Sequence, residues 1–305
     1  MTDPSDQPAT AVEAEPDSVA AWLGSLMPST PLGASGGQLF NQLVGNPGKA
    51  SYSTAAELSE LATVSVSSVT RLAQRLGFEG WPDLQREIRA RYLAHLSLLE
   101  VADAHGGSDT PFQTSIRKDT AALATALRDV DEPQIGRVAG LLAAAANIYV
   151  TAQGSFSAVG QSMVHNIRIA GYPARDLLDN PVSMSNIVAQ IGANDVLIVC
   201  SYWRLYHAAV IAASAAHARG AKVIVIADNI SPALYKSSDE VILVTAESNS
   251  FFPSLTAAMS VQQGIVATLA RLDSERTRKN LVAVENSWQE FNLLHRSVPR
   301  IPLGT

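Results

Sequence analysis

The feature that most constrains this chain is a pair of short amphipathic helical segments joined by a tight turn at residues 53–78. Thr54 is a predicted N-cap, and Glu57 three residues later completes a capping box, so a helix is expected to begin here. Ser65 is the predicted N-cap of a second helix, which Gly77 is expected to end. Two helices joined in this way form a helix-turn-helix unit, whose second helix can enter the major groove of DNA.

The second helix is predicted to pack on the first through one side and to turn its other side outward. The predicted inward side carries Val66, Val69, Leu72, Ala73 and Leu76. The outward side carries hydroxyl, amide and guanidinium groups, which can hold phosphates and bind base edges. The candidate DNA-binding residues are therefore Ser65, Ser67, Ser68, Arg71, Gln74 and Arg75. The spacing alone is equally compatible with an ordinary helical hairpin whose polar side faces only water.

The same stretch resembles the N-terminal domain of the RpiR/MurR family of bacterial transcription regulators. The resemblance rests on the run VSVSSVTRLAQRLGFEGWPDLQREI, which follows the family pattern R-x-L-G-F-x-G-[FW]-x-x-L without a gap. It implies that Ser65, Ser67, Ser68 and Arg71 face DNA. It also implies that the segment from Gly77 to Trp81 turns the chain into the next helix, where Pro82 suits the first turn.

Length and charge allow a small DNA-reading module attached to an acidic domain. At 305 residues two domains are the natural expectation, and a hydrophobic content of 47% is ample for packed cores. The net charge of −6 argues against non-specific coating of nucleic acid but allows a local DNA-binding surface. The single cysteine, Cys200, lies in an apolar run and allows no internal disulfide, which fits a reducing cytosol.

The N-terminal segment 1–17 is acidic and rich in proline and alanine, which predicts a disordered tail. It lacks the basic start and the apolar core of a signal peptide, and no apolar stretch of the chain reaches transmembrane length. We therefore expect a soluble, cytoplasmic protein with no membrane partner.

From residue 147 onward apolar strands alternate with helices, which predicts an α/β domain with a doubly wound parallel sheet. The predicted strands are 147–152, 173–178, 195–201, 221–228 and 240–245, and the helices predicted before them are 18–27, 36–44, 81–101, 112–130 and 133–146. The predicted organisation is a tail at 1–17, an α-helical helix-turn-helix domain at 18–103, a linker at 104–111 and the α/β domain at 112–305.

Side chains that bear hydroxyl groups are dense where the predicted strands end. Doubly wound sheets bind ligands at the carboxyl ends of their strands. The candidate effector-binding residues are therefore Ser155, Ser157, Ser201, Tyr202, Arg204 and Ser254. The serines also lie close to predicted helix starts, so they could equally serve as helix caps.

This second half resembles the sugar isomerase (SIS) domain that follows the same helix-turn-helix in RpiR-type regulators. The matching landmarks are Gly154, Gly171, Asp195, Ser201 and the run GAKVIVIADNISP at 220–232. The resemblance implies a domain that binds a small-molecule metabolite, such as a sugar or sugar phosphate. It also implies association through helices into a homodimer or a homotetramer.

Two loops depart from the pattern of phosphosugar-binding SIS domains, which is G-x-G-x-S in the first loop and S-x-S-G-x-T in the third. Phe156 occupies the usual serine position of the first loop. In the third loop Trp203, Arg204 and Tyr206 replace serine, glycine and threonine. Two interpretations are open: Arg204 binds an anionic effector, or the aromatic side chains fill the pocket and the effector is less polar or absent.

We expect a ligand-responsive regulator that binds a double-stranded DNA operator as a dimer. The main alternative is a sugar-phosphate isomerase with an accessory helical domain, and the altered loops argue against it. A third alternative is a regulator whose second domain only dimerises. The run GNPGKAS at 45–51 does not have the residue spacing of a phosphate-binding loop. The histidines do not have the spacing of metal ligands, and no Ser-His-Asp triad can be assigned to them. No catalytic residue, metal or cofactor is therefore predicted.

Overall fold

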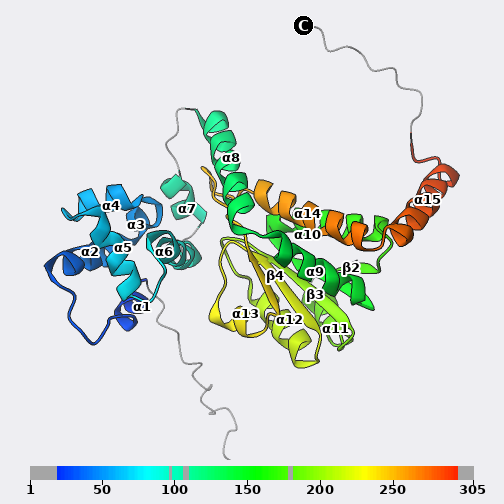
Figure 1. Ribbon diagram of the computed structural model, residues 1–305, viewed down its shortest axis with the longest axis horizontal. Coiled ribbons are helices and arrows are strands. Elements are labelled where there is room, and N and C mark those ends of the chain that lie inside the picture. Colours follow the sequence, from blue (N-terminus) through cyan, green and yellow to red (C-terminus); the bar gives the residue numbers. More distant parts are fainter. Residues whose placement is uncertain (1–18, 96–97, 106–109, 178–180, 295–305) are drawn as a thin grey trace, which may run out of the picture. The chain divides into compact units, whose positions relative to one another are not determined.

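The computed structural model describes residues 19–95, 98–105, 110–177 and 181–294. The chain divides into two compact units, residues 1–106 and 107–305 (Figure 1), which we call the helical domain and the sheet domain. The predicted tail at 1–17 lies outside the described residues. Of the predicted linker at 104–111, residues 104 and 105 belong to a helix, residue 111 begins the next helix, and 106–109 lie outside the described residues.

The helical domain packs short helices around a core in which Leu23, Leu39, Leu43, Leu84 and Ile88 have no exposed surface. Its described helices are α1 (Val19–Ser25), α2 (Ala34–Gly45), α3 (Pro47–Tyr52), α4 (Ala55–Leu61), α5 (Val66–Arg75), α6 (Trp81–His95) and α7 (Leu98–His105). The single helix predicted at 81–101 is thus two helices, α6 and α7. The helix α3 was not predicted.

Helix α3 owes its stability to side chains from α6. The last carbonyl groups of a helix have no partner within the helix and must be satisfied from outside. Here the Trp81 indole donates to the Ser53 carbonyl at 3.1 Å, and the Gln85 amide donates to the Ala50 carbonyl at 3.1 Å. The Arg89 guanidinium donates to a third carbonyl of this segment at 2.8 Å. These long-range bonds explain why a segment that contains both proline and glycine is helical.

The turn between α4 and α5 has the geometry that the sequence predicts. Thr54 accepts a hydrogen bond from the Glu57 backbone, and the Glu57 carboxylate accepts one from the Thr54 backbone at 2.7 Å, so the capping box is confirmed. Thr63 ends α4 in the left-handed region at φ 54°, and Gly77 ends α5 at φ 94°. A left-handed residue closes a helix because it turns the next N–H groups back to the last carbonyls. Glycine adopts this region without strain, whereas the β-branched Thr63 is strained.

The sheet domain is a five-stranded parallel sheet with helices on both faces, as predicted. The strand order is β2-β1-β3-β4-β5. The strands are β1 (Asn147–Ala152), β2 (Ala174–Asp176), β3 (Asp195–Ser201), β4 (Lys222–Ala227) and β5 (Glu240–Leu243). All four pairings are parallel, and β3 pairs with β1 on one side and with β4 on the other. The strand order therefore reverses between β1 and β3, which is the switch point where such sheets bind ligands.

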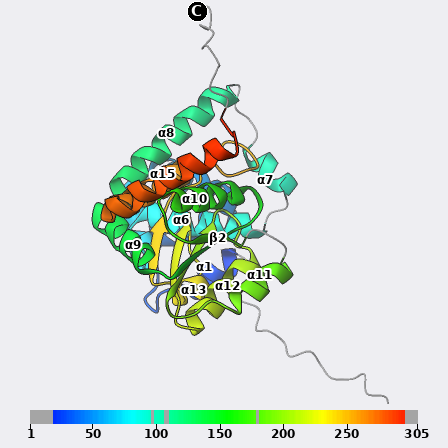
Figure 2. The same ribbon diagram turned by 90° about the vertical axis from the view of Figure 1, so that its right-hand side faces the viewer.

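Figure 1 shows α9, α10 and α14 on one face of the sheet and α11, α12 and α13 on the other. Helices α8 and α15 pack on α14, and α15 also crosses α10 (Figure 2). The helices are α8 (Pro111–Asp129), α9 (Glu132–Ala144), α10 (Ser157–Ile169), α11 (Pro181–Val188), α12 (His207–Ala218), α13 (Pro232–Lys236), α14 (Thr256–Leu272) and α15 (Ser274–Glu290). Helix α13 was not predicted.

The centre of the sheet is as apolar as its sequence indicates. Every residue of β3 is buried, in agreement with the prediction of a strand covered on both faces. Cys200 lies in this strand, and burial raises the pKa of its thiol to about 12, which suppresses the reactive thiolate. Within the described ranges, no helix is both long enough and apolar enough to cross a membrane.

Candidate DNA-binding surface and effector site

Helix α5 presents a short polar surface to solvent and packs its other side into the core. Ser67, Arg71 and Gln74 are exposed along one side of the helix. Val69, Leu72, Ala73 and Leu76 are buried in the core of the helical domain, as predicted. The prediction is wrong for Val66, the first residue of α5, which is 48% exposed.

The polar groups at the start of α5 are linked to one another. The hydroxyl of Ser65 lies 2.9 Å from that of Ser67 and 2.9 Å from that of Ser68. The Arg71 guanidinium donates to the Ser68 hydroxyl at 3.2 Å. Ser65 is the N-cap of α5, but its hydroxyl makes no cap hydrogen bond and instead joins this row. The row holds the Arg71 side chain beside the start of the helix.

Ser68 and Arg75 have other surroundings than the sequence predicts. Ser68 is only 9% exposed, so the expectation that it lies on the outward side is wrong. It supports Arg71 from beneath. The Arg75 guanidinium donates to the carbonyls of Thr30 at 2.8 Å and Pro31 at 3.2 Å, so it anchors the segment that precedes α2. Gln74 donates weakly to the Glu79 carbonyl at 3.4 Å and stays exposed.

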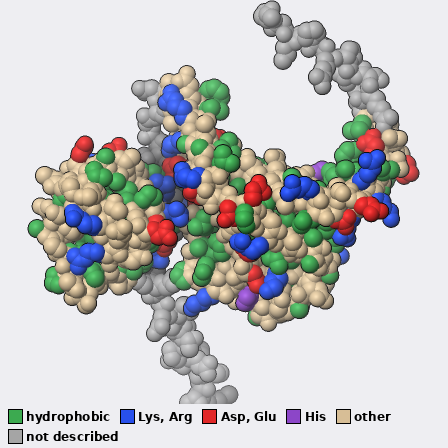
Figure 3. Space-filling view, in the orientation of Figure 1, with side chains coloured by type: hydrophobic (Ala, Val, Ile, Leu, Met, Phe, Trp, Pro, Cys, Tyr) green, Lys and Arg blue, Asp and Glu red, His purple; other side chains and the backbone are tan. Residues whose placement is uncertain are grey.

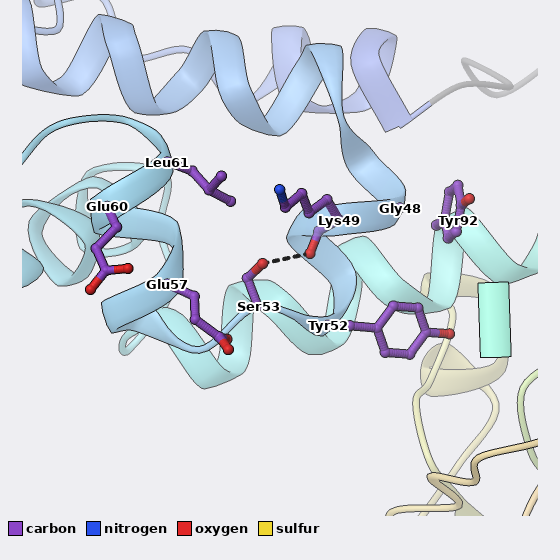
Figure 4. A pocket seen from close by; sticks show the side chains of 8 residues that line it. All are labelled: Gly48, Lys49, Tyr52, Ser53, Glu57, Glu60, Leu61 and Tyr92. Carbon is purple, nitrogen blue, oxygen red and sulfur yellow. Dashed lines mark hydrogen bonds between the residues drawn. The ribbon is translucent and has the colours of Figure 1, made fainter. Parts of the chain in front are cut away.

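Two hollows flank the helix-turn-helix. A groove of about 310 Å³ lies between α5 and the first turn of α2, and Arg71, Arg75 and Ser35 line it. A second groove of about 750 Å³ lies between α3, α4 and α6 (Figure 4). Figure 4 shows Tyr52 and Tyr92 at one end of the second groove and two carboxylates, Glu57 and Glu60, at the other.

The charged side chains that line the two grooves favour different kinds of binding partner. The hydrogen bonds from the Thr54 backbone and hydroxyl keep the pKa of Glu57 below its usual range, so this carboxylate is charged at neutral pH. The carboxylates of the second groove therefore oppose a phosphate, whereas the arginines of the first groove favour one. On the face shown in Figure 3, the basic side chains of the helical domain are few and separated.

The first and third loops of the sheet domain meet through aromatic side chains. Phe156 is 5% exposed, and its ring lies 5.4 Å from that of Tyr202 and 6.1 Å from that of Tyr206, in edge-to-face contacts. Gly154 has φ 58°, and a Cβ atom there would lie 2.9 Å from the Tyr206 hydroxyl. The aromatic packing that the second interpretation of these loops requires is therefore present.

The third loop is held by bonds within the chain. Trp203 adopts a left-handed φ of 58°, and the next residue donates its backbone N–H to the Tyr202 carbonyl at 2.6 Å. The Trp203 backbone N–H lies 3.0 Å from each carboxylate oxygen of Asp228, and its indole donates to the Ala246 carbonyl at 3.0 Å. Asp228, which follows β4 directly, was not among the predicted site residues. Its position, as an acidic residue at the carboxyl end of a strand, could have indicated that it belongs to this site.

The remaining candidate effector residues differ in how available they are. Ser155 is exposed and Ser157 is half-buried at the start of α10, while Ser201 is buried at the end of β3. Arg204 is half-buried. The Ser254 hydroxyl donates to an Asp119 carboxylate oxygen at 2.6 Å.

The buried Tyr202 side chain is the least accessible of the candidates. Burial, followed by the nearby Cys200 and Asp228, raises the pKa of its hydroxyl well above the usual range. Among the described residues, no hydrogen-bond partner meets this hydroxyl. The described residues also contain no cluster of three or more histidine, cysteine or acidic side chains that could hold a metal ion.

Comparisons with known proteins agree with this division into two domains. The model of the helix-turn-helix domain of the rpiR family matches residues 29–95, and the model of the SIS domain matches residues 141–268. The chain thus carries an rpiR-family helix-turn-helix domain followed by a SIS domain, the organisation of an RpiR-type transcriptional regulator. A relative of this RpiR-type regulator is the uncharacterized HTH-type transcriptional regulator YfhH of Escherichia coli (strain K12). It is 25% identical over 216 residues, which are 69% of this chain and 76% of that protein.

Solved structures share the fold. The Vibrio vulnificus NanR protein, complexed with ManNAc-6P, matches with a TM-score of 0.56 and 16% identity over 91% of this chain and 99% of its own. The sugar isomerase domain of an RpiR transcription factor from Sphaerobacter thermophilus matches with a TM-score of 0.55 and 21% identity. That match covers 59% of this chain and 99% of the other.

Proposed function

We propose that this RpiR-type regulator binds a double-stranded DNA operator through the outward side of α5 and is controlled by a small metabolite in its SIS domain. The observation that carries the DNA-binding proposal is the exposed row of Ser67, Arg71 and Gln74 on a helix whose opposite side is buried. Such a helix can enter the major groove while its apolar side keeps it on the domain. A cytoplasmic location follows from a role on genomic DNA.

The chemistry of this row suits base edges and phosphates. An arginine can donate two hydrogen bonds to a guanine, and each such pair contributes about 1–3 kcal/mol of discrimination against a wrong base. Arg71 is the candidate for this contact, because the Ser68 hydroxyl already orients its guanidinium. Ser67 and Gln74 would add hydrogen bonds to bases or phosphates. Arg75 would contribute mainly by fixing the segment before α2.

The metabolite is proposed to bind at the switch point of the sheet, between the loops that follow β1 and β3. Support comes from the fold, since parallel sheets with this strand order bind ligands there. The NanR structure contains ManNAc-6P, which suggests a sugar derivative as the class of effector. The effector would act only by binding the DNA-competent and DNA-incompetent states with different affinities. The protein is proposed to act by binding, not by catalysis.

We further propose that the sheet domains associate into a homodimer or homotetramer through α8 and α15. Phe112, Ile116, Leu123 and Leu127 recur along one side of α8 and are all exposed. Apolar surface of this kind marks interaction sites. Two subunits would then present two α5 helices to operator half-sites about one helical turn apart. Sedimentation analysis of the full chain checks this proposal, because a monomer at micromolar concentration would contradict it.

The DNA-binding proposal is tested by selection from fragmented genomic DNA of the source organism. The full chain is incubated with the fragments, and the bound DNA is sequenced. Enriched fragments should share a repeated or palindromic half-site, and the neighbouring genes would indicate the pathway that supplies the effector. Bound fragments without a common motif, together with equal affinity for scrambled duplexes, would contradict the proposal.

A further inference from the structure

The loop after β3 contains a backbone arrangement that favours an anion. Trp203 has a left-handed φ of 58°, and the N–H of the following residue closes a three-residue turn onto the Tyr202 carbonyl at 2.6 Å. The N–H of Arg204 is used within this turn, so the anion of this loop is held by the Trp203 backbone N–H. The loop lies at the switch point, where the proposed effector would bind.

The anion in this arrangement is a carboxylate of the chain itself. Both carboxylate oxygens of Asp228 lie 3.0 Å from the Trp203 backbone nitrogen. The strand register explains the contact, because Ser201 of β3 pairs with Ala227 of β4 and Asp228 is the next residue along β4. The Asn229 amide also donates to Asp228 at 3.1 Å, which helps to hold the carboxylate in this position.

The neighbouring groups are better matched to an uncharged ligand than to a phosphate. Phe156 and Tyr206 cover the first loop, and the Tyr206 hydroxyl lies over Gly154. The Tyr202 side chain has no exposed surface, so its hydroxyl offers a phosphate no accessible donor. Arg204 is half-buried and interacts with another part of the chain.

We propose that the Asp228 carboxylate permanently occupies the anion position of this loop, so that the effector is an uncharged metabolite without a phosphate group. A phosphate would have to displace a carboxylate that is bound within the chain and would then lie beside its charge. The inference rests on the proposed effector role of the SIS domain and narrows the class of ligand. The removal of Asp228 should expose the N–H group to external anions.

The test is a calorimetric titration of the full chain with inorganic phosphate and with glucose 6-phosphate, supported by thermal unfolding. The natural protein should show no binding and no rise in Tm at about 10 mM ligand, because only a bound ligand raises Tm. Asp228→Ala should bind both anions at least about tenfold more tightly than the natural protein does, because the Trp203 backbone N–H is released and the negative charge of Asp228 is removed. Asp228→Asn keeps an acceptor for Trp203 and should show a smaller gain.

Asp239→Asn is the matched control. The Asp239 carboxylate also accepts a backbone N–H, from Val223 at 2.9 Å, but at the opposite end of β4. This variant should remain unresponsive to both anions. Tight binding of phosphate by the natural protein would overturn the proposal, and so would a folded Asp228→Ala protein that binds neither anion. Because the titration contains no DNA, its outcome is independent of whether the chain binds an operator.

Discussion

The polar side of α5 and the polar loops of the SIS domain both carry hydroxyl groups and an arginine, but these side chains have different surroundings in the two regions. On α5, Ser67 and Arg71 face solvent, because the apolar side of a short helix is enough to hold it on the domain. In the SIS domain, Ser254 and the third loop bond to other parts of the chain. Ser67 and Arg71 are therefore more accessible than Ser254 and the third loop.

The largest difference that we expect between α5 and the SIS loops is in how much a substitution lowers stability, and it is largest in the SIS domain. Phe156→Ala should lower its free energy of unfolding by about 3–5 kcal/mol, because truncation of a buried aromatic side chain leaves a cavity. Urea denaturation measures the change. Phe251→Ala is the matched control, since Phe251 also makes an edge-to-face ring contact but is 55% exposed. Equal stability losses in the two variants would show that Phe156 does not close the first loop.

A smaller effect is expected at Ser254. Ser254→Ala removes a 2.6 Å hydrogen bond to the Asp119 carboxylate and should cost about 1–3 kcal/mol of stability. The same measurement on Ser155→Ala should give a change within about 0.5 kcal/mol, because Ser155 is exposed. We expect this bond to hold the segment before α14 on α8, and a Ser254→Ala protein that kept full stability but lost the response to the effector would contradict this.

The smallest stability effect is expected on α5 itself. Ser67→Ala should change the free energy of unfolding by no more than about 0.5 kcal/mol, because Ser67 is exposed and its hydroxyl bonds only to Ser65 among the described residues. Its affinity for the selected operator should nevertheless fall. Ser260→Ala, an exposed serine of α14, serves as the control and should leave operator affinity unchanged. A Ser67→Ala protein that lost stability but kept its affinity for the operator would contradict the view that Ser67 serves binding rather than stability.

Local signals in the sequence were sufficient for much of the fold. The capping box of Thr54 and Glu57 and the buried strand β3 were predicted correctly, because each depends on residues close in sequence. The left-handed residues that follow α4 and α5, Thr63 and Gly77, differ in how well the sequence predicts them. Gly77 was predicted to end α5 because glycine favours that conformation, whereas the left-handed φ of Thr63 has no signal in the residue type.

The features that were missed depend on contacts between distant segments. Helix α3 is completed by side chains of α6, and Arg75 is engaged by carbonyls of residues 30 and 31. The bond between Trp203 and Asp228 requires the register of β3 against β4. Helical periodicity placed Ser68 outward, but the structure buries it to 9% exposure. None of these contacts follows from the spacing of residues along one segment.

The proposed DNA-reading role of α5 is tested most directly by the operator affinity of Arg71→Ala, measured by fluorescence anisotropy at fixed salt. Arg86→Ala is the control, because Arg86 is a similarly exposed arginine of the same domain that pairs with Asp83 on α6. We predict that Arg71→Ala loses about 1–3 kcal/mol on the operator and far less on scrambled DNA, while Arg86→Ala binds both as the natural protein does. An Arg71→Ala protein that still prefers the operator as strongly as the natural protein would contradict the account.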